Sequence, residues 1–334
     1  MAEAKKNNPI KTAITIAVSL AFAGFFLWLA LKGLDFEVIK ASLSKANYLW
    51  VAFAACFGLG AYWFRAVRWN LLLEPMGHSI SNSNSLWSIS FGYLMNLTIP
   101  RSGEVARATA LYGVEKVPVD QSFGTIILER VVDLVCMLAF LGLTLIFKYD
   151  AILSFYKQSG VNINPNKIAL IFGALAVCGI VFFAIRKRLA NVPVLGKIVG
   201  FIDGILDGLM SIFRMKQKAK FILYTVLIWI CYYFAAYLVC FSLPETSDFG
   251  FADGFFILVV GTLGMIIPAS GGIGAFNLAM KFGFMALFIS MGKDGNLGGE
   301  VGLIYSFISL PLQICIMLVM GLISIPMLAK ARKF

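Results

Sequence analysis

The stretch NLTIPRSGEVAR, residues 96–107, decides the fold because it interrupts an apolar region with a proline, a glycine and three charged side chains. Pro100 cannot donate a backbone hydrogen bond and Gly103 permits a sharp turn, so one continuous helix is not expected here. Inside a membrane, irregular backbone is tolerated only where it is buried in protein or lines a wet cavity. The stretch therefore predicts a broken helix whose turn carries polar chemistry.

A related stretch, IPASGGIG, follows 168 residues later at residues 267–274. Its isoleucine, proline, serine and first glycine recur with the spacing of the first stretch, but it carries no charge. The chain therefore divides into two related halves, 13–147 and 168–328, within one membrane domain that spans 1–334. We assign a hairpin or gating role to Pro100, Ser102, Gly103, Pro268, Ser270, Gly271, Gly272, Gly274 and Asn277.

Composition places the chain among integral membrane proteins. Hydrophobic residues make up 60% of the sequence and charged residues 13%, and the mean hydropathy is +0.87. A soluble protein of 334 residues needs more polar surface than this. We attribute the net charge of +11 to cytoplasmic loops and anionic lipid heads, because no basic domain that could bind nucleic acid lies outside the apolar segments. Six apolar runs are long enough to span a bilayer: 13–31, 46–64, 121–147, 168–185, 221–244 and 301–328.

The distribution of charge predicts the topology. Between Arg186 and Lys220 there are eight basic and two acidic residues, so this loop is expected in the cytoplasm together with both basic chain ends. These positions agree only if the broken segments at 83–113 and 254–290 are re-entrant hairpins that enter from opposite sides. The predicted fold is therefore all-α, a polytopic membrane helical bundle of about six full spans with two re-entrant helical hairpins related as an inverted repeat. The alternative is eight full spans with a weaker charge bias.

Cysteine and histidine usage argues against metal sites and disulfides. The six cysteines lie in apolar segments without a CxxC pair, and His78 is the only histidine. No nucleotide-binding motif is present, so a primary pump is not expected. We therefore expect no metal, no cofactor, no catalytic residue and no nucleic-acid partner.

The first hairpin and the span that follows it contribute three arginines and three carboxylates: Arg101, Glu104, Arg107, Glu129, Arg130 and Asp133. Their spacing of three or four residues within each segment places them on a common helix face, provided that the second arm of the hairpin is helical. One interpretation is a set of ion pairs that holds the hairpin in place. The other, which we favour, is a site for a zwitterionic or charged lipid headgroup, because arginine forks match phosphate and charges at membrane depth are usually functional. The carboxylates would then face an amine or a hydroxyl, and the two interpretations are compatible.

Three further polar residues are candidates for the same site. Arg65 and Arg68 end the predicted span 46–64, either as anchors that extend to the lipid heads or as contacts to a lipid phosphate. Asn96 either caps the broken arm or contacts the ligand. The glycines after Pro268 serve either tight helix packing or a gate whose amides face the cavity.

The sequence motifs around these residues resemble those of a known protein family. The run 96–107, the segment from Glu129 to Asp133, the Arg65-x-x-Arg68-Trp69 segment and the later Pro-x-x-Gly-Gly-x-Gly are similar to the lysylphosphatidylglycerol synthase/flippase transmembrane family, which includes UPF0104-type membrane proteins. The resemblance covers nearly the whole chain and implies movement of lipids between the leaflets of the inner membrane. Members often carry an acidic residue just after the glycine motif, where this chain has Phe276 and Asn277.

The sequence thus predicts a lipid flippase-like transporter, not an enzyme, that moves a polar or aminoacylated phospholipid headgroup across the inner membrane. A membrane phospholipid is the expected partner, a separate lipid-modifying enzyme is a further candidate, and no soluble synthase domain is expected. Two alternatives stay open: a membrane enzyme that acts on a lipid phosphate, and a transporter of small solutes or ions built on the same hairpins.

Overall fold

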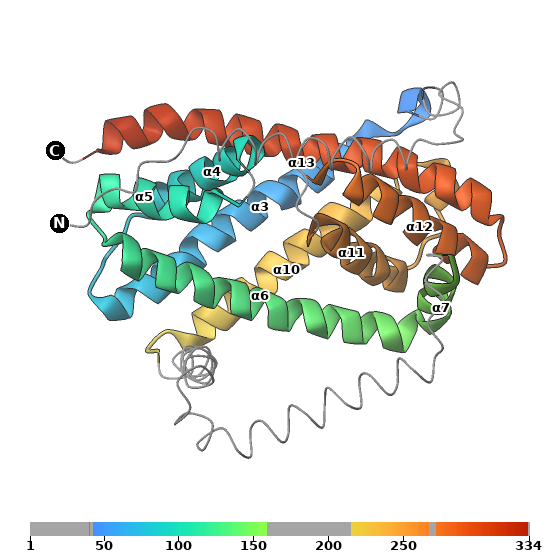
Figure 1. The fold of residues 1–334 in the computed structure, drawn as a ribbon, viewed down its shortest axis with the longest axis horizontal. Coiled ribbons are helices and arrows are strands. Elements are labelled where there is room, and N and C mark those ends of the chain that lie inside the picture. Colours follow the sequence, from blue (N-terminus) through green and yellow to red (C-terminus); the bar gives the residue numbers. More distant parts are fainter. Residues whose placement is uncertain (1–39, 41–42, 100, 159–214, 267–271, 333–334) are drawn as a thin grey trace, which may run out of the picture.

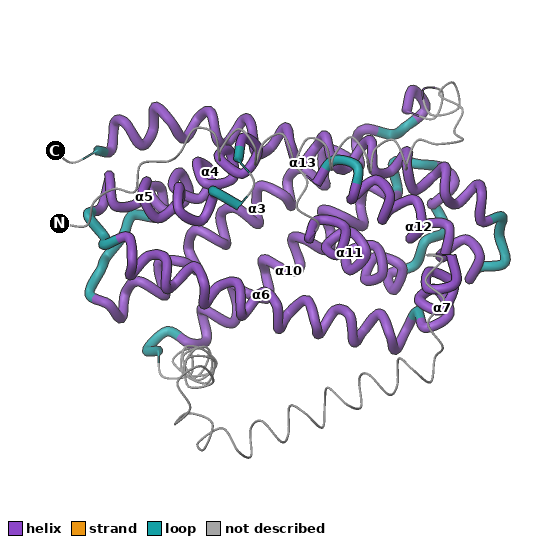
Figure 2. The backbone as a smooth tube through the Cα atoms, viewed as in Figure 1, coloured by secondary structure: helices purple, strands orange, loops and turns teal. Residues whose placement is uncertain are grey.

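The structure is a computed structural model that describes residue 40 and residues 43–99, 101–158, 215–266 and 272–332. Over these residues the chain forms helices joined by loops, and none of them lies in a strand (Figure 2). The α-helices are α3 (Tyr48–Leu73), α4 (Asn82–Thr98), α5 (Gly103–Glu115), α6 (Val119–Phe147), α7 (Tyr149–Gln158), α10 (Lys218–Cys240), α11 (Phe251–Ile266), α12 (Ala275–Ser290) and α13 (Gly295–Ala331).

Four helices in the described part of the chain are long and apolar enough to cross a membrane: α3 with the short turn that follows it, α6, α10 and α13. They coincide with the predicted spans 46–64, 121–147, 221–244 and 301–328. The predicted spans 13–31 and 168–185 lie outside the described residues. The all-helical class and the membrane character of the chain are therefore confirmed, and the total number of spans stays a prediction.

The predicted end of the second span is wrong. Helix α3 continues without a break to Leu73, so Arg65 and Arg68 lie inside it. Both arginines are buried and pair with Asp133 of α6 instead of extending to lipid heads. These partners neutralise the two charges inside the helix, and the interpretation of the two arginines as anchors at a helix end is wrong.

Two pairs of short helices lie between the long ones. Helices α4 and α5 have 17 and 13 residues, α11 and α12 have 16 each, and the two members of each pair pack together. Figure 1 shows the first pair towards the end of the molecule where α13 ends, and the second pair towards the end where α13 begins. Each predicted break thus separates two packed helices. Pro100, Pro268, Ser270 and Gly271 lie outside the described residues.

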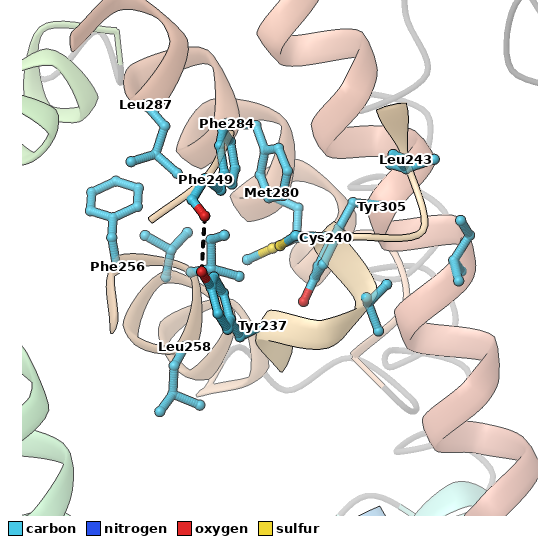
Figure 3. Packing of buried hydrophobic residues seen from close by; sticks show 14 of the residues in the cluster. Tyr237, Cys240, Leu243, Phe249, Phe256, Leu258, Met280, Phe284, Leu287 and Tyr305 are labelled. Carbon is cyan, nitrogen blue, oxygen red and sulfur yellow. Dashed lines mark hydrogen bonds between the residues drawn. The ribbon is translucent and has the colours of Figure 1, made fainter. Parts of the chain in front are cut away.

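The largest apolar core joins the second pair to α10 and α13 (Figure 3). Phe256, Met280, Phe284 and Tyr305 are each at most 2% exposed. The hydroxyl of Tyr237 on α10 donates to the carbonyl oxygen ahead of α11, at residue 249, over 2.9 Å. A smaller apolar cluster lies under the first pair and contains Trp69, Ile89, Leu111 and Ile126. These two cores fix the helix pairs against the long helices.

Candidate functional site

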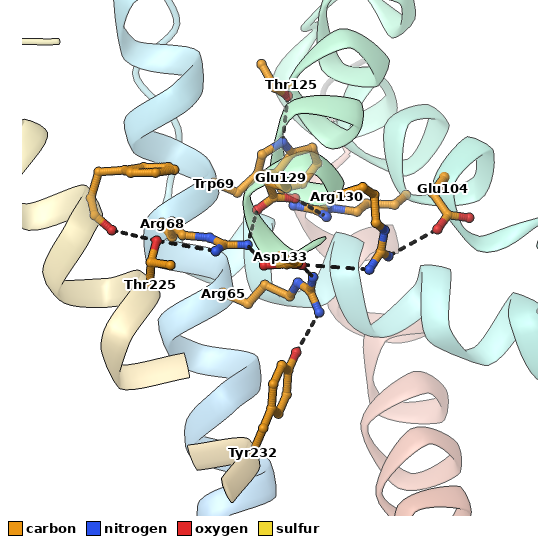
Figure 4. A network of polar contacts seen from close by, with 12 residues as sticks. Arg65, Arg68, Trp69, Glu104, Thr125, Glu129, Arg130, Asp133, Thr225 and Tyr232 are labelled. Carbon is orange, nitrogen blue, oxygen red and sulfur yellow. Dashed lines mark hydrogen bonds and ion pairs between the residues drawn. The ribbon is translucent and has the colours of Figure 1, made fainter. Parts of the chain in front are cut away.

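Five charged side chains from three helices meet in the interior next to the first helix pair (Figure 4). Helix α3 supplies Arg65 and Arg68, α5 supplies Arg107, and α6 supplies Glu129 and Asp133. We call these five residues the buried charge network, because their side chains are between 0% and 14% exposed. Asp133 lies at the middle of α6, so the network is placed deep within a helix that is long enough to span the membrane.

Asp133 joins the two arginines of α3. Its Oδ1 accepts a hydrogen bond from Nη2 of Arg68 at 3.0 Å, and its Oδ2 pairs with Nη2 of Arg65. The other terminal nitrogen of Arg65 donates to the hydroxyls of Tyr93 at 2.7 Å and Tyr232 at 2.6 Å. Since Tyr93 belongs to α4 and Tyr232 to α10, Arg65 connects four helices.

Glu129 joins the network to the first helix pair. Its Oε2 accepts a hydrogen bond from Nη1 of Arg107 at 2.6 Å, and its Oε1 lies 3.7 Å from Nη2 of Arg68. The guanidinium of Arg107 lies over the ring of Trp69, 3.6 Å from its centroid, which stabilises the buried cation. The indole N–H of Trp69 donates to the hydroxyl of Thr125 at 2.9 Å and so fixes the orientation of that ring.

Glu104 and Arg130 form a more exposed pair at the rim of the network. Nη2 of Arg130 lies 3.1 Å from Oε1 of Glu104, and the two side chains are 45% and 29% exposed. Nη1 of Arg130 also lies 4.0 Å from Asp133. Arg130 is therefore the arginine of this site with the most freedom to change partners.

The buried charge network is not electrically balanced. Three arginines face two carboxylates, so one positive charge is in excess. Nε of all three arginines, Nη2 of Arg107 and Oε1 of Glu129 are buried and hydrogen-bond to no described residue. A buried charge without a counter-charge is costly, so the network offers a place for an anion.

Arg101 lies apart from the network, although its spacing predicted a face shared with Glu104 and Arg107. It sits in the turn before α5, which begins only at Gly103, and it has a positive φ of 63° and an exposed side chain. Within the described ranges it enters none of the ion pairs of the site. The spacing argument fails because Arg101 precedes the first helical residue.

Asn96 and the glycines around it close the first hairpin. The Asn96 side-chain oxygen accepts a hydrogen bond from the backbone N–H of Gly103 at 2.7 Å, which is the capping role that was considered for it. A Cβ atom added to Gly92 would lie 2.7 Å from the carbonyl oxygen of Gly103. The hydroxyl of Ser102 donates to the carbonyl oxygen of Ile99 at 2.7 Å. The two helices therefore cross at a point with no room for a side chain.

Asn277 has a comparable role in the second hairpin. Its side-chain oxygen accepts from the N–H of Gly274 at 2.9 Å, and its side-chain nitrogen donates to the hydroxyl of Ser306 on α13 at 2.7 Å. Gly272 and Gly274 have φ of 76° and 83°, a region that favours glycine. The asparagine supplies an acceptor and a donor together, which a carboxylate does not.

A cavity of about 600 Å³ lies next to the network, between α3, α6, α10, α11 and α13. Most of its wall is apolar and includes Leu134, Ile257, Met265 and Ile316. Its polar end is formed by Tyr62, Arg65, Tyr93, Arg130, Asp133 and Tyr232. A space with one charged end and apolar walls suits an amphipathic molecule.

The charged residues do not share this single cavity. Glu104 and Arg107 instead line a narrow crevice with Gly92, Asn96 and Gly103, and Arg130 lines both spaces. The crevice lies between the two arms of the first hairpin and α6. The predicted site is thus divided between two spaces. Glu104 and Arg107 line the crevice, whereas Arg65 and Asp133 line the cavity.

The polar partners of the arginines were not identified from the sequence. Tyr93, Tyr232 and Thr225 lie in apolar stretches where aromatic and hydroxyl residues are common, and their neighbours in the sequence give no sign of a charged partner. Both tyrosines accept hydrogen bonds from Arg65, which is 28 and 167 residues away in the chain. Among the described residues, no group of three or more His, Cys, Asp or Glu side chains is arranged to hold a metal ion.

Comparison with known proteins adds the following. The sequence model of the lysylphosphatidylglycerol synthase TM region matches residues 16–318. A UPF0104 membrane protein of Methanocaldococcus jannaschii is 28% identical over 132 residues, which is 39% of this chain and 39% of that protein. The glycosyltransferase AglD of Haloferax volcanii is 24% identical over 310 residues, which is 83% of this chain and 49% of that protein. The chain thus spans about half of these relatives or less, and no solved structure matches it.

Proposed function

We propose, from the premise that this chain belongs to the family of the lysylphosphatidylglycerol synthase transmembrane region, that it is a transporter which moves a phospholipid headgroup between the two leaflets of the inner membrane. The observation that carries the proposal is the cavity beside the buried charge network. Its polar end holds Arg65, Arg130 and Asp133, and its apolar wall can accommodate the first part of the lipid tails.

The proposed topology has six full spans and two re-entrant hairpins. An α-helix needs about 20 residues to cross the hydrocarbon core, and none of the four helices in the two pairs reaches this length. The pairs lie towards opposite ends of the molecule, as two hairpins of an inverted repeat would (Figure 1).

The charges of the two ends support an orientation. Lys116, Lys218, Lys330 and Arg332 lie at the helix ends around the first pair, whereas acidic residues such as Asp294 lie around the second. We assign the first end to the cytoplasm, together with both chain termini, because cytoplasmic loops carry the excess of basic residues.

In the proposed transport, the protein binds the lipid headgroup and carries out no chemical step on it. Arg65 and Arg130 hold the phosphate of the headgroup, and the two helix pairs limit its access from each side. A transporter of small solutes and an enzyme that acts on a lipid phosphate are the competing functions. They differ from the proposal in what crosses the membrane and in whether the lipid leaves unchanged.

A transport assay with cavity variants tests the proposal. The purified protein is placed in liposomes with a fluorescent phospholipid, and the accessible fraction of the lipid is followed after a quencher is added outside. Ala235 lines the cavity, so Ala235→Phe should remove most of the transport by filling free space. Val226 lies on the same helix but is 49% exposed and does not line the cavity, so Val226→Phe is the matched control.

The outcomes separate movement of the lipid through the cavity from chemistry on the lipid and from a path elsewhere. Wild-type transport that is lost in Ala235→Phe and kept in Val226→Phe supports movement of the lipid through the cavity. A chemically altered lipid, detected by mass spectrometry, would favour the enzyme. Equal transport by both variants would contradict a path through this cavity.

A further inference from the structure

We propose that helix α13 bends at Pro311 during transport and thereby couples the movements of the two helix pairs. This inference rests on the proposed function and assigns a moving part to it. A cavity that opens alternately to the two sides of a membrane requires the elements that close it to move relative to each other. The contacts of α13 show how one helix can link these elements.

Helix α13 packs closely against both helix pairs. Figure 1 shows it running along the molecule past the second pair and then past the first. A Cβ atom added to Gly302 would collide with the backbone of α12 at Met280. A Cβ atom added to Gly321 would lie 2.5 Å from the Cβ of Leu94 on α4. Because packing this close leaves no free space, each part of α13 is expected to move together with the pair that it contacts.

Pro311 lies inside α13 between these two contacts. A proline has no N–H to donate to the carbonyl oxygen four residues earlier, here that of Phe307, and its ring crowds that carbonyl. The helix is therefore weakened at this one point. The other long helix that contacts both pairs, α6, has no proline within it. Of the two helices, α13 is thus the one in which a bend is favoured.

A bend at Pro311 would also change the shape of the cavity. Tyr305 lines the cavity from the part of α13 before the proline, and Leu312 and Ile316 line it from the part after the proline. The two parts of α13 therefore contribute to the same wall, and a change in the angle between them moves one part of the wall against the other. Movement of the helix pairs and the shape of the binding space are linked in this way.

Replacement of Pro311 by alanine tests the inference in the liposome transport assay. Pro311→Ala restores a helical hydrogen bond, and it opens no gap in the interior because Pro311 is exposed, so the variant should melt no lower than the wild type. We expect transport to slow roughly three- to tenfold, because bending must then break the restored hydrogen bond. Pro326→Ala is the matched control, since Pro326 is also exposed and lies between Gly321 and Leu328, which both contact the first pair or its core.

Spin labels measure the bending itself. Tyr112 on α5 is 50% exposed and Ile289 on α12 is 36% exposed, so labelled cysteines at these two positions report the distance between the helix pairs. The labels are introduced into a protein whose six native cysteines have been replaced, and the distance is measured by double electron–electron resonance. We expect a broader distribution of distances with Pro311 present than in Pro311→Ala, and an unchanged distribution in Pro326→Ala.

The two experiments distinguish failure of this inference from failure of the proposed function. Wild-type transport by Pro311→Ala, or an equal loss in both proline variants, would overturn the hinge and leave the function standing. Equal distance distributions with and without Pro311 would also overturn the hinge. Absence of lipid transport by the wild-type protein would overturn the function, whereas a distribution that narrows only in Pro311→Ala would still support the hinge.

Discussion

Replacing Glu129 by glutamine should destabilise the protein more than replacing its partner Arg107 by methionine. Glu129 is fully buried and lies 2.6 Å from Arg107 and 3.7 Å from Arg68. Two unit charges 4 Å apart attract by about 4 kcal/mol at an effective dielectric constant of 20. Removal of one partner from a buried pair costs about 3–5 kcal/mol. Glu129→Gln leaves three arginines against one carboxylate, so we expect a loss near the top of this range.

The Arg107 variant should be milder because it removes the excess charge. Arg107→Met leaves two arginines and two carboxylates, and the methionine can still pack on the ring of Trp69. We expect a loss of about 2–3 kcal/mol, because Glu129 loses its hydrogen bond from Arg107 and the cation–π contact is lost, while the ion pair with Arg68 at 3.7 Å remains. The double variant should be more stable than Glu129→Gln alone, because two arginines instead of three then face the one remaining carboxylate.

Thermal unfolding of the purified variants in one detergent measures these differences. By the scaling for soluble domains, Glu129→Gln should lower the melting temperature by roughly 10 °C. Glu245→Gln is the control, because Glu245 is an exposed acidic residue outside the site. Strictly additive effects of Glu129→Gln and Arg107→Met, or a larger loss for Arg107→Met, would refute the reasoning about excess positive charge.

Three other predictions concern the hairpins and their anchors. Gly103→Leu should abolish most transport, because the leucine Cβ would collide with Gly92 and Asn96. Gly113→Leu on the same helix meets open space and should transport normally, and liposome assays compare the two variants. Single cysteines introduced near Glu115 and Lys330 should be labelled from the cytoplasm and one near Asp294 from outside, and labelling of all three from one side would contradict the proposed topology. Lys148→Met should lower the melting temperature clearly, because it leaves the buried carboxylate of Asp253 without the ammonium group 2.6 Å away. Lys293→Met breaks only an exposed ion pair, which is worth at most about 1 kcal/mol. Equal shifts in melting temperature would count against burial as the cause.

The local features of the two hairpins could be predicted from the sequence. Gly103 and Asn96 act within seven residues of each other, so the amide that Asn96 caps lies within reach of a local argument. The apolar runs likewise placed the long helices, since hydropathy and length decide whether a helix can span. These properties belong to short segments of chain.

The partners of the charges could not be predicted in the same way. Arg65 and Arg68 pair with a carboxylate 65 or more residues away, and the tyrosines that accept from Arg65 come from two other helices. Such contacts depend on how the helices pack, which spacing along one helix does not specify. Arg101 shows that helical spacing also fails locally, because this residue lies in the turn before α5 begins.

The central claim is that the headgroup of a lipid enters the cavity beside the buried charge network. Photo-crosslinking with a phospholipid that carries a diazirine on its headgroup, followed by peptide mass spectrometry, tests this claim most directly. We predict adducts on cavity-lining residues at the polar end, above all Tyr62 and Tyr232, and their loss when excess phosphatidylglycerol competes. Adducts confined to residues of the outer surface such as Leu138 and Val226, which are 53% and 49% exposed, would contradict the account.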